Sequence, residues 1–359
     1  MTLRATAFHA RVAAANRCNA WQTRNGYTLA AAYGDAQDEV LAARSCAALI
    51  DISWHWRLLF EGARAAECLS RICTRDVSAL VPGAHTEIAW LDDRGLVRGA
   101  GRVERLGRER FRLVAAAPDD CWMARAAALF EVATRDVTGQ AAGLALCGPL
   151  APAAVAAAGI ATRVSAHGLQ RLVWNAREIE ILGTPSGFEI RCAADDALFL
   201  WDCMVRAGQD FALLPMGLQA QDMLAVGRGV VQPGIDYRPG QEPPEALGLG
   251  QLVATGHKRF NGRSALLARP AGPILMGISL DSPEPAPRAP VSFEGRDVGR
   301  TLSSTVSPLL GHAIALAKIE AGAAVAGRRV LVSATEGMLT PLPFLQDAGV
   351  AFAEASPSV

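Results

Sequence analysis

Residues 181–208, ILGTPSGFEIRCAADDALFLWDCMVRAG, join the pattern of a strand to the pattern of a helix. In the second half, apolar residues recur at three- and four-residue steps, which predicts an amphipathic helix that Asp195 can cap and Gly208 can end. A turn and a short strand precede it, and we expect Glu189 where this strand passes into the helix. A buried acid needs a partner. Glu189 is therefore either a ligand-binding residue or an exposed one, and this stretch leaves both open.

Composition sets the first limits on function. A length of 359 residues favours two or three domains. The chain is 51% hydrophobic and 19% charged, which is typical of a folded globular protein. Its 35 Lys and Arg residues balance 35 Asp and Glu residues, and no basic run stands out. The sequence therefore indicates no nucleic-acid partner and no attraction to an anionic membrane.

Residues 137–162 form an uncharged stretch that could suggest a membrane span. Gly148, Pro149 and Pro152 interrupt it, and most of its apolar residues are alanine. We interpret it as a buried strand followed by a helix that begins at a proline. The N-terminus lacks the apolar run of a signal peptide. These patterns predict a cytoplasmic protein with no membrane partner.

The cysteines and histidines show no metal-binding pattern. None of the eight cysteines forms a CxxC pair, and the six histidines lack metal-ligand spacing. Several cysteines lie within apolar helical runs. We interpret them as small core residues kept reduced, and we expect no metal site.

Helical and strand patterns alternate irregularly over the first 270 residues. Helical periodicity covers residues 35–49 and 63–72, and residues 49–62 alternate like one strand. Residues 85–117 predict strands joined by tight turns. There is no glycine-rich nucleotide-binding motif and no internal repeat.

The composition changes near the C-terminus. Residues 280–290, LDSPEPAPRAP, are proline-rich and suit a connector. Beyond them, residues 291–304, 313–319 and 328–334 have the pattern of short strands separated by Gly and Pro turns. This region predicts a small β-barrel or sandwich.

Set in order, these segments resemble the family of the glycine cleavage T-protein. Relatives in that family include tetrahydrofolate-dependent demethylases and the folate domains of sarcosine and dimethylglycine oxidases. LALCGP (residues 144–149) stands where the family has Leu-Ala-Leu-Gln-Gly-Pro, and PSGFEI (185–190) is similar to its Gly-hydrophobic-Glu-hydrophobic strand. The other segments that carry the resemblance are residues 42–53, 60–80, 200–208, 216–230, 243–253, 258–268, 295–319 and 342–344.

The resemblance implies an α+β fold of three domains, a cloverleaf around a central hole through which folate is threaded. A discontinuous first domain would comprise residues 1–50 and 140–245. The second would comprise residues 51–139 with about 246–270. The third, residues 271–359, would be a C-terminal β-barrel.

The resemblance also assigns cofactor-binding residues. Glu189 falls on the family's pterin-binding acid, and a carboxylate can accept two parallel N–H bonds from an aminopyrimidine edge. We therefore expect Glu189 to bind tetrahydrofolate, and Glu189→Gln to weaken binding without unfolding the protein. Gln221 stands where the family has a folate-contacting Arg. That exchange forfeits a charged hydrogen bond of roughly 1.5–3 kcal/mol, so we expect weaker folate binding.

The chain departs from the family at the catalytic acid. In GLVRGAGRV (residues 95–103), Gly99 and Ala100 stand where the family has an aspartate pair. Leu345 replaces a late aromatic residue, and Ala115 or a neighbour replaces an asparagine. These departures argue against the ordinary glycine cleavage reaction.

Four other side chains are candidates for the substrate site. Alternation along a strand places Trp54 and Trp56 on one face and His55 on the other. Two indoles on one face either hold a cationic methyl donor by cation–π contact or are core residues. His85 stands near where the family often has Tyr. It is the titratable group nearest to the expected cleft, so it is either the catalytic acid or a structural histidine.

Three functions stay open. The leading one is one-carbon transfer to tetrahydrofolate from a small methylated substrate, preferably a sulfonium or quaternary ammonium compound, whose leaving group needs no proton. The second is a folate-binding subunit that accepts formaldehyde or an iminium from a partner oxidase. The third is a non-catalytic folate-binding assembly protein, since YRPGQE (residues 237–242) resembles that branch's signature without its cysteine.

Overall fold

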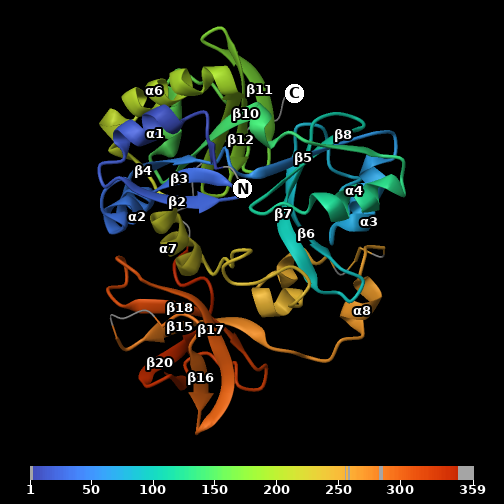
Figure 1. Cartoon of the computed structure of the whole chain (residues 1–359), viewed down its shortest axis with the longest axis vertical. Coiled ribbons are helices and arrows are strands. Elements are labelled where there is room, and N and C mark those ends of the chain that lie inside the picture. The colour runs from blue at the N-terminus through green and yellow to red at the C-terminus, as the bar shows by residue number, and fades with distance from the viewer. Residues whose placement is uncertain (1–2, 255, 258, 283–285, 347–359) are drawn as a thin grey trace, which may run out of the picture.

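The computed structural model describes residues 3–254, 256–257, 259–282 and 286–346. The chain forms three lobes (Figure 1). Two of them lie side by side and are built from the N-terminal two thirds of the chain. The third is a barrel formed by the C-terminal part.

Two sheets and five helices build the first lobe. Its strands are β1 (Arg4–Ala5), β2 (Ala20–Arg24), β3 (Tyr27–Ala32), β4 (Ala47–Asp51), β10 (Ala141–Cys147), β11 (Leu169–Trp174), β12 (Arg177–Thr184), β13 (Gly187–Ala193) and β14 (Leu213–Pro215). Its helices are α1 (His9–Ala15), α2 (Ala36–Ser45), α5 (Ala151–Ala157), α6 (Ala197–Ala207) and α7 (Leu218–Arg228). The larger sheet has the order β11-β12-β13-β10-β4-β14, and the smaller one has the order β1-β3-β2. One face of the larger sheet packs against α5 and α6 through Leu144, Ile190 and Leu200.

The predicted amphipathic helix is α6, and it ends at Gly208 as expected. The expected cap at Asp195 is wrong, because Asp195 lies in a short 3-10 turn (Ala194–Asp196) that precedes the helix. The strand also continues further than predicted. Glu189 lies in the middle of β13, with four more strand residues after it. The side chain of Glu189 therefore belongs to the sheet and not to the strand–helix connection.

The second lobe contains one five-stranded sheet and two helices. The strands are β5 (Trp56–Glu61), β6 (His85–Leu91), β7 (Val97–Arg105), β8 (Arg110–Ala115) and β9 (Ala133–Asp136), in the order β6-β7-β8-β5-β9. The helices are α3 (Ala65–Ile72) and α4 (Asp120–Ala128). Their apolar faces and one face of the sheet enclose a core that includes Leu69, Trp90, Phe111 and Met123.

The prediction of one strand through residues 49–62 is wrong. The segment forms two strands in two sheets, since β4 ends at Asp51 and β5 begins at Trp56. Asp51 accepts a hydrogen bond from the backbone N–H of Ser53, 2.9 Å away, which is an Asx-type contact that turns the chain. At this turn the chain passes from the first lobe to the second.

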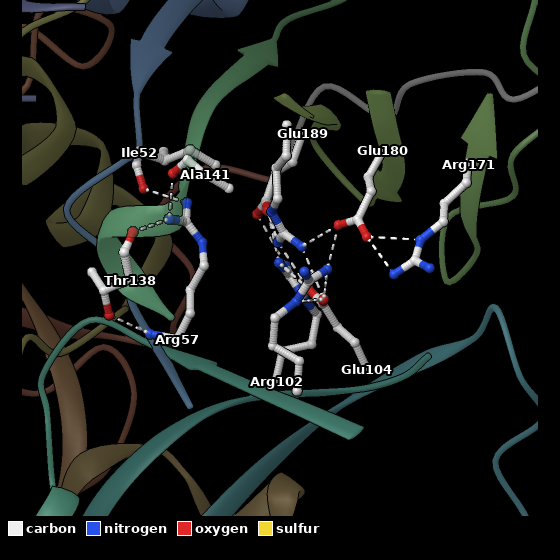
Figure 2. Close-up of polar contacts among 11 residues, drawn as sticks. Ile52, Arg57, Arg102, Glu104, Thr138, Ala141, Arg171, Glu180 and Glu189 are labelled. Carbon is white, nitrogen blue, oxygen red and sulfur yellow. Dashed lines mark hydrogen bonds and ion pairs between the residues drawn. The ribbon is translucent and has the colours of Figure 1, made fainter. Parts of the chain in front are cut away.

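Buried Arg57 contacts both of the segments in which the chain passes between these two lobes. It follows the first crossing, and its guanidinium donates to the carbonyl oxygens of Ile52 (3.0 Å) and Ser53 (3.3 Å). It also donates to the carbonyl oxygens of Thr138 and Ala141, both at 3.2 Å, in the segment that leads back to the first lobe (Figure 2). One side chain thus donates hydrogen bonds to backbone acceptors of both connections.

The third lobe is the predicted barrel. Its strands are β15 (Ile274–Leu280), β16 (Pro290–Phe293), β17 (Arg296–Val306), β18 (Ala313–Ile319), β19 (Arg329–Val332) and β20 (Thr335–Thr340), closed in the order β15-β18-β17-β16-β19-β20. The proline-rich segment, which the sequence predicts as a connector, joins β15 to β16 within this lobe; residues 283–285 lie outside the described part. Helix α8 (Arg263–Leu267) precedes the barrel.

Short 3-10 helices complete the connections, at Thr138–Gln140, Gln209–Phe211, Pro244–Leu247 and Gly250–Leu252. The predicted α+β class with a closed C-terminal barrel is confirmed. Within the described residues, no helix has both the length and the apolar composition that crossing a membrane requires.

Candidate functional site

The first two lobes face each other through charged side chains. Along β13, Phe188 and Ile190 point into the first core, so alternation turns Glu189 and Arg191 toward the second lobe. On the opposing strand β7, Val103 points into the second core, and its neighbours Arg102 and Glu104 turn toward the first lobe. Strand alternation on both sides thus brings acids and bases to one interface.

These four charged residues form an interdomain ion-pair network with two more, Arg112 and Glu180 (Figure 2). Arg102 holds Glu189 with a fork of two bonds, Nη1 to Oε1 at 3.0 Å and Nη2 to Oε2 at 2.7 Å. Arg191 adds a third bond to Glu189 Oε2 at 2.7 Å. The members of the network are Arg102, Glu104, Arg112, Glu180, Glu189 and Arg191.

Glu104 is the centre of the network. It is completely buried and accepts two hydrogen bonds from Arg191, at 2.8 and 2.9 Å, and one from Arg112 at 2.7 Å. Arg112 also reaches Glu180 at 2.6 Å, and Arg171 pairs with Glu180 at the exposed edge. The network therefore extends from the centre of the interface to the surface.

Charge compensation keeps the buried acids ionised. Burial alone would raise the pKa of Glu189, but the charges of Arg102 and Arg191 outweigh it and hold that pKa well below its usual range. The pKa of Glu104 is lowered in the same way: burial opposes ionisation, and Arg112, Arg191 and Arg102 together outweigh it. Both groups are carboxylates at neutral pH.

Glu189 as it stands does not fit a pterin. An aminopyrimidine edge needs both carboxylate oxygens for its two parallel N–H groups. Arg102 already occupies them with the same kind of donor pair. Glu189 is also only 9% exposed, which does not agree with the open cleft residue on which the expected tolerance of Glu189→Gln is based. The role of Glu189 as a cofactor ligand stays a prediction.

Trp54 and Trp56 do not share a face, because the turn before β5 separates them. Trp54 packs with Tyr27, Leu29 and Leu218 in the first lobe. Trp56 belongs to the core of the second lobe, where its Nε1 donates to the side chain of Asp120. Both indoles are almost fully buried. They do not form one joint cation site.

His55 lies between the two indoles in sequence and remains half-buried. Its ring stands edge-on to that of Trp54, with the centroids 4.5 Å apart. Burial lowers the pKa of His55 to about 3, although the negative charge of Glu189 opposes this. His55 is therefore neutral at pH 7, and it interacts electrostatically with the negative charge of Glu189.

His85 is closed off from the expected cleft. It is 4% exposed, and its Nε2 lies 2.9 Å from the carbonyl oxygen of Gly183 in β12. Since a carbonyl only accepts, we assign the ring proton to Nε2. Burial lowers the pKa of His85 to about 4, so the ring is neutral at pH 7. His85 links the two lobes, which agrees with the structural alternative, and its catalytic role stays a prediction.

Side chains at residues 99 and 100, where the resemblance places aspartates, point to opposite faces of the sheet. Gly99 pairs with Trp90, and a Cβ at Gly99 would lie 2.3 Å from Cζ2 of that indole. Only glycine fits there. Ala100 pairs with Ala89 on the other face, which it shares with Arg102. A carboxyl at residue 100, but not at residue 99, would point toward the interface between the lobes.

Glu87 is a candidate residue that the sequence reading missed. It shares its sheet face with His85 and Ala89, and it pairs with Arg102 across the ladder. Its side chain is exposed, and no hydrogen bond or ion pair to another described residue is seen. The surrounding protein still desolvates the carboxyl and raises its pKa, an effect that Arg102 partly offsets. Two-residue alternation from His85 could have identified Glu87.

Gln221 lies away from the network. It belongs to α7, which packs against β3 of the first lobe and against β17 and β18 of the barrel. Its Nε2 lies 3.5 Å from the carbonyl oxygen of Met216. The structure thus does not bring Gln221 into contact with Glu189.

Two cavities open beside the interface. One of about 590 Å³ is lined by Arg112, Arg171 and Arg191 together with apolar residues such as Ile179. The other, of about 380 Å³, lies near the crossings between the lobes and includes Tyr27, Ser53 and Thr138 in its lining. In the described part of the chain, no group of three or more His, Cys, Asp or Glu side chains could hold a metal ion.

Comparison with known proteins identifies the architecture. Residues 5–257 match the GCVT N-terminal domain, and residues 274–344 match the glycine cleavage T-protein C-terminal barrel domain. The aminomethyltransferase of Frankia alni is 32% identical over 295 residues, 79% of this chain and 80% of that protein. The trimethylamine-oxide aldolase of Ruegeria pomeroyi is 28% identical over 344 residues, 90% of this chain but 43% of that protein.

A solved structure agrees on the fold. The glycine cleavage system aminomethyltransferase T from Bartonella henselae superposes with a TM-score of 0.86 at 23% identity, covering 98% of this chain and all of that one. The matched domains and the curated relatives define a class of tetrahydrofolate-dependent one-carbon transferases. Within that class, the chain belongs to the glycine cleavage T-protein family. The resemblance read from the sequence is confirmed.

Proposed function

We propose that this protein transfers a one-carbon unit to tetrahydrofolate from a small methylated donor that carries its own leaving group. A sulfonium or quaternary ammonium compound is such a donor. The observation that carries the proposal is the sheet face around Ala100. Ala100, one of the two positions where the resemblance places an aspartate, offers only a methyl group, and His85, further along the same face of the sheet, is neutral and buried.

The chemistry of the leaving group follows from these residues. A methyl group on an ether or a neutral amine leaves only when an acid protonates the departing atom. A sulfonium or quaternary ammonium releases a neutral molecule and needs no acid. Correct placement of the donor then provides most of the rate enhancement.

Glu87 supports a cationic donor. Its exposed carboxyl has no partner among the described residues, and it stands on the same face as Ala89 and Ala100. When ionised, it can attract a positive sulfonium or ammonium. This assigns the cation-holding role to Glu87 in place of Trp54 and Trp56, which are buried in separate cores.

Two other donors are compatible with particular observations. The raised pKa of Glu87 favours a neutral acid that protonates an ether or amine leaving group. The lack of an acid at Ala100 equally suits formaldehyde or an iminium handed over by a partner oxidase, since such carbon atoms arrive already electrophilic. The match to a trimethylamine-oxide aldolase over less than half of its length is compatible with a partner or an additional domain.

A donor panel tests the proposal. The protein is incubated with tetrahydrofolate and sulfonium, quaternary ammonium, aryl methyl ether or formaldehyde donors, and 5-methyl- and methylene-tetrahydrofolate are measured. We expect 5-methyltetrahydrofolate with the cationic donors, and a higher KM for them in Glu87→Gln, with Glu109→Gln in an exposed turn as control. Turnover of ethers alone, with a kcat in Glu87→Gln that no longer depends on pH, would instead make Glu87 the acid.

A further inference from the structure

The fork between Arg102 and Glu189 has a consequence for cofactor binding. We infer that Arg102 is an internal substitute for the pterin edge, which competes with tetrahydrofolate for Glu189 and thereby sets the affinity for the cofactor. This rests on the proposed function, in which tetrahydrofolate is the acceptor. Arg102 is then a residue that determines cofactor affinity and not only a member of an ion-pair network.

The two donors are chemically equivalent at the carboxylate. A guanidinium presents two parallel N–H groups in a plane, and an aminopyrimidine edge presents the same pattern. Arg102 makes both bonds to Glu189, at 3.0 and 2.7 Å. A carboxylate has one end-on position for such a pair, so the guanidinium and the pterin exclude one another there.

Glu189 keeps a partner when Arg102 is removed. Arg191 donates to Oε2 at 2.7 Å and is itself held by Glu104, so one cation stays beside the carboxylate. Among the described residues, Oε1 accepts only from Arg102. Removing the Arg102 side chain therefore frees one oxygen fully and leaves the other with a single bond.

The space that would be vacated lies on the relevant face. Arg102 shares its strand face with Ala100, and it pairs with Glu87 across the ladder. Ala100 is small, and the side chains of Arg102 and Glu189 are each about one tenth exposed. Truncation at Arg102 thus opens room for a planar ring beside Glu189.

Arg112 provides a matched control within the same network. It has the same side-chain exposure as Arg102, 9%, and lies on the neighbouring strand β8. Its partners are Glu104 and Glu180, and none of its bonds goes to Glu189. Replacing Arg112 disturbs the network to a similar degree without freeing Glu189.

The experiment measures tetrahydrofolate affinity by isothermal titration calorimetry for the parent, Arg102→Ala, Arg102→Lys and Arg112→Ala, with thermal unfolding to confirm that each is folded. We expect Arg102→Ala to bind roughly tenfold tighter than the parent or better, the equivalent of about one recovered charge-assisted hydrogen bond. Arg102→Lys should fall between them, since an ammonium cannot form the fork. Arg112→Ala should show no gain, and adding Glu189→Gln to Arg102→Ala should abolish the gain.

Each outcome decides the question. If Arg102→Ala does not fold, the test is whether Arg102→Lys binds tetrahydrofolate more tightly than the parent. If the folded Arg102 variants bind tetrahydrofolate no more tightly than the parent, or if Arg112→Ala tightens binding equally, the inference is wrong. Binding and turnover by the parent would still support the proposed function. Binding by Arg102→Ala alone supports the inference and refutes the proposed function for the native chain. No binding by any of the proteins refutes both.

Discussion

Glu189→Gln should destabilise the protein, because it leaves Arg102 and Arg191 with one fewer negative charge. Both guanidiniums are buried, and both donate to Glu189 at 2.7 Å. Removing one partner of a buried ion pair typically costs about 3–5 kcal/mol. Since Glu104 continues to pair with both arginines, we expect the lower end of that range, about 3 kcal/mol.

Urea denaturation followed by tryptophan fluorescence measures this change. The cores of both lobes contain buried tryptophans, Trp174 and Trp201 in the first and Trp56 and Trp90 in the second, so the signal reports on both. The control is Glu67→Gln, the same exchange in an exposed pair with Arg64 at 2.8 Å, where side-chain exposures are 56% and 49%. Exposed pairs contribute little, so the control should lose less than about 0.5 kcal/mol. Equal losses in the two variants would refute the assignment of Glu189 to a buried network.

The pH dependence gives a second check. In the folded protein the pKa of Glu189 is well below the unfolded-state value of about 4.3. The ionised carboxylate therefore stabilises the fold at every pH above that value, and this contribution is lost as pH falls through the folded-state pKa. The stability gap between the parent and Glu189→Gln should be constant from pH 7 to about 5 and shrink below about 4. A gap that widens in acid would contradict the charge-based explanation.

Two further predictions concern the hairpin and the cysteines. Gly99→Asp should lower stability by about 3 kcal/mol in the urea assay, because its Cβ would overlap the ring of Trp90, whereas Ala100→Asp, on the face toward the interface between the lobes, should stay within about 1 kcal/mol of the parent. Thiol titration in denaturant should count eight free thiols, and in the native state exposed Cys18 and Cys121 should react first. Fewer than eight thiols, or fast reaction of the buried cysteines, would contradict this assignment.

The parts of the fold that sequence predicted are those with local signals. Helix α6 shows its period within eleven residues and ends at a glycine, and the barrel strands are separated by Gly and Pro turns. The crossing between β4 and β5 gave no such signal. Strands in two different sheets share the same two-residue period, and the turn between them is marked only by short-range contacts, from the N–H of Ser53 to Asp51 and from the N–H of His55 to the carbonyl of Ile52.

The network could not be predicted from the sequence for a different reason. Arg102 and Glu189 are separated by 87 positions, and each looks locally like an ordinary solvated charge. Their pairing depends on how the sheet of one lobe meets the sheet of the other. Resemblance to a family identified Glu189 as a candidate ligand-binding residue. It gave no information about Arg102, which occupies the same carboxylate in this protein.

The Glu189 carboxylate cannot pair with Arg102 and bind tetrahydrofolate at the same time, so its contribution to stability and its contribution to cofactor binding are coupled. If tetrahydrofolate takes the Glu189 carboxylate, the fork from Arg102 must first break, and its free energy is subtracted from the binding energy. Arg102→Ala removes that cost before the cofactor arrives, so it should lose stability without ligand and gain more stability from the same tetrahydrofolate concentration than the parent does. If the network is purely structural, Arg102→Ala should lose stability without ligand but gain no more stability from tetrahydrofolate than the parent does. The two measurements on one pair of proteins therefore distinguish a competing arginine from an arginine that only holds the lobes together.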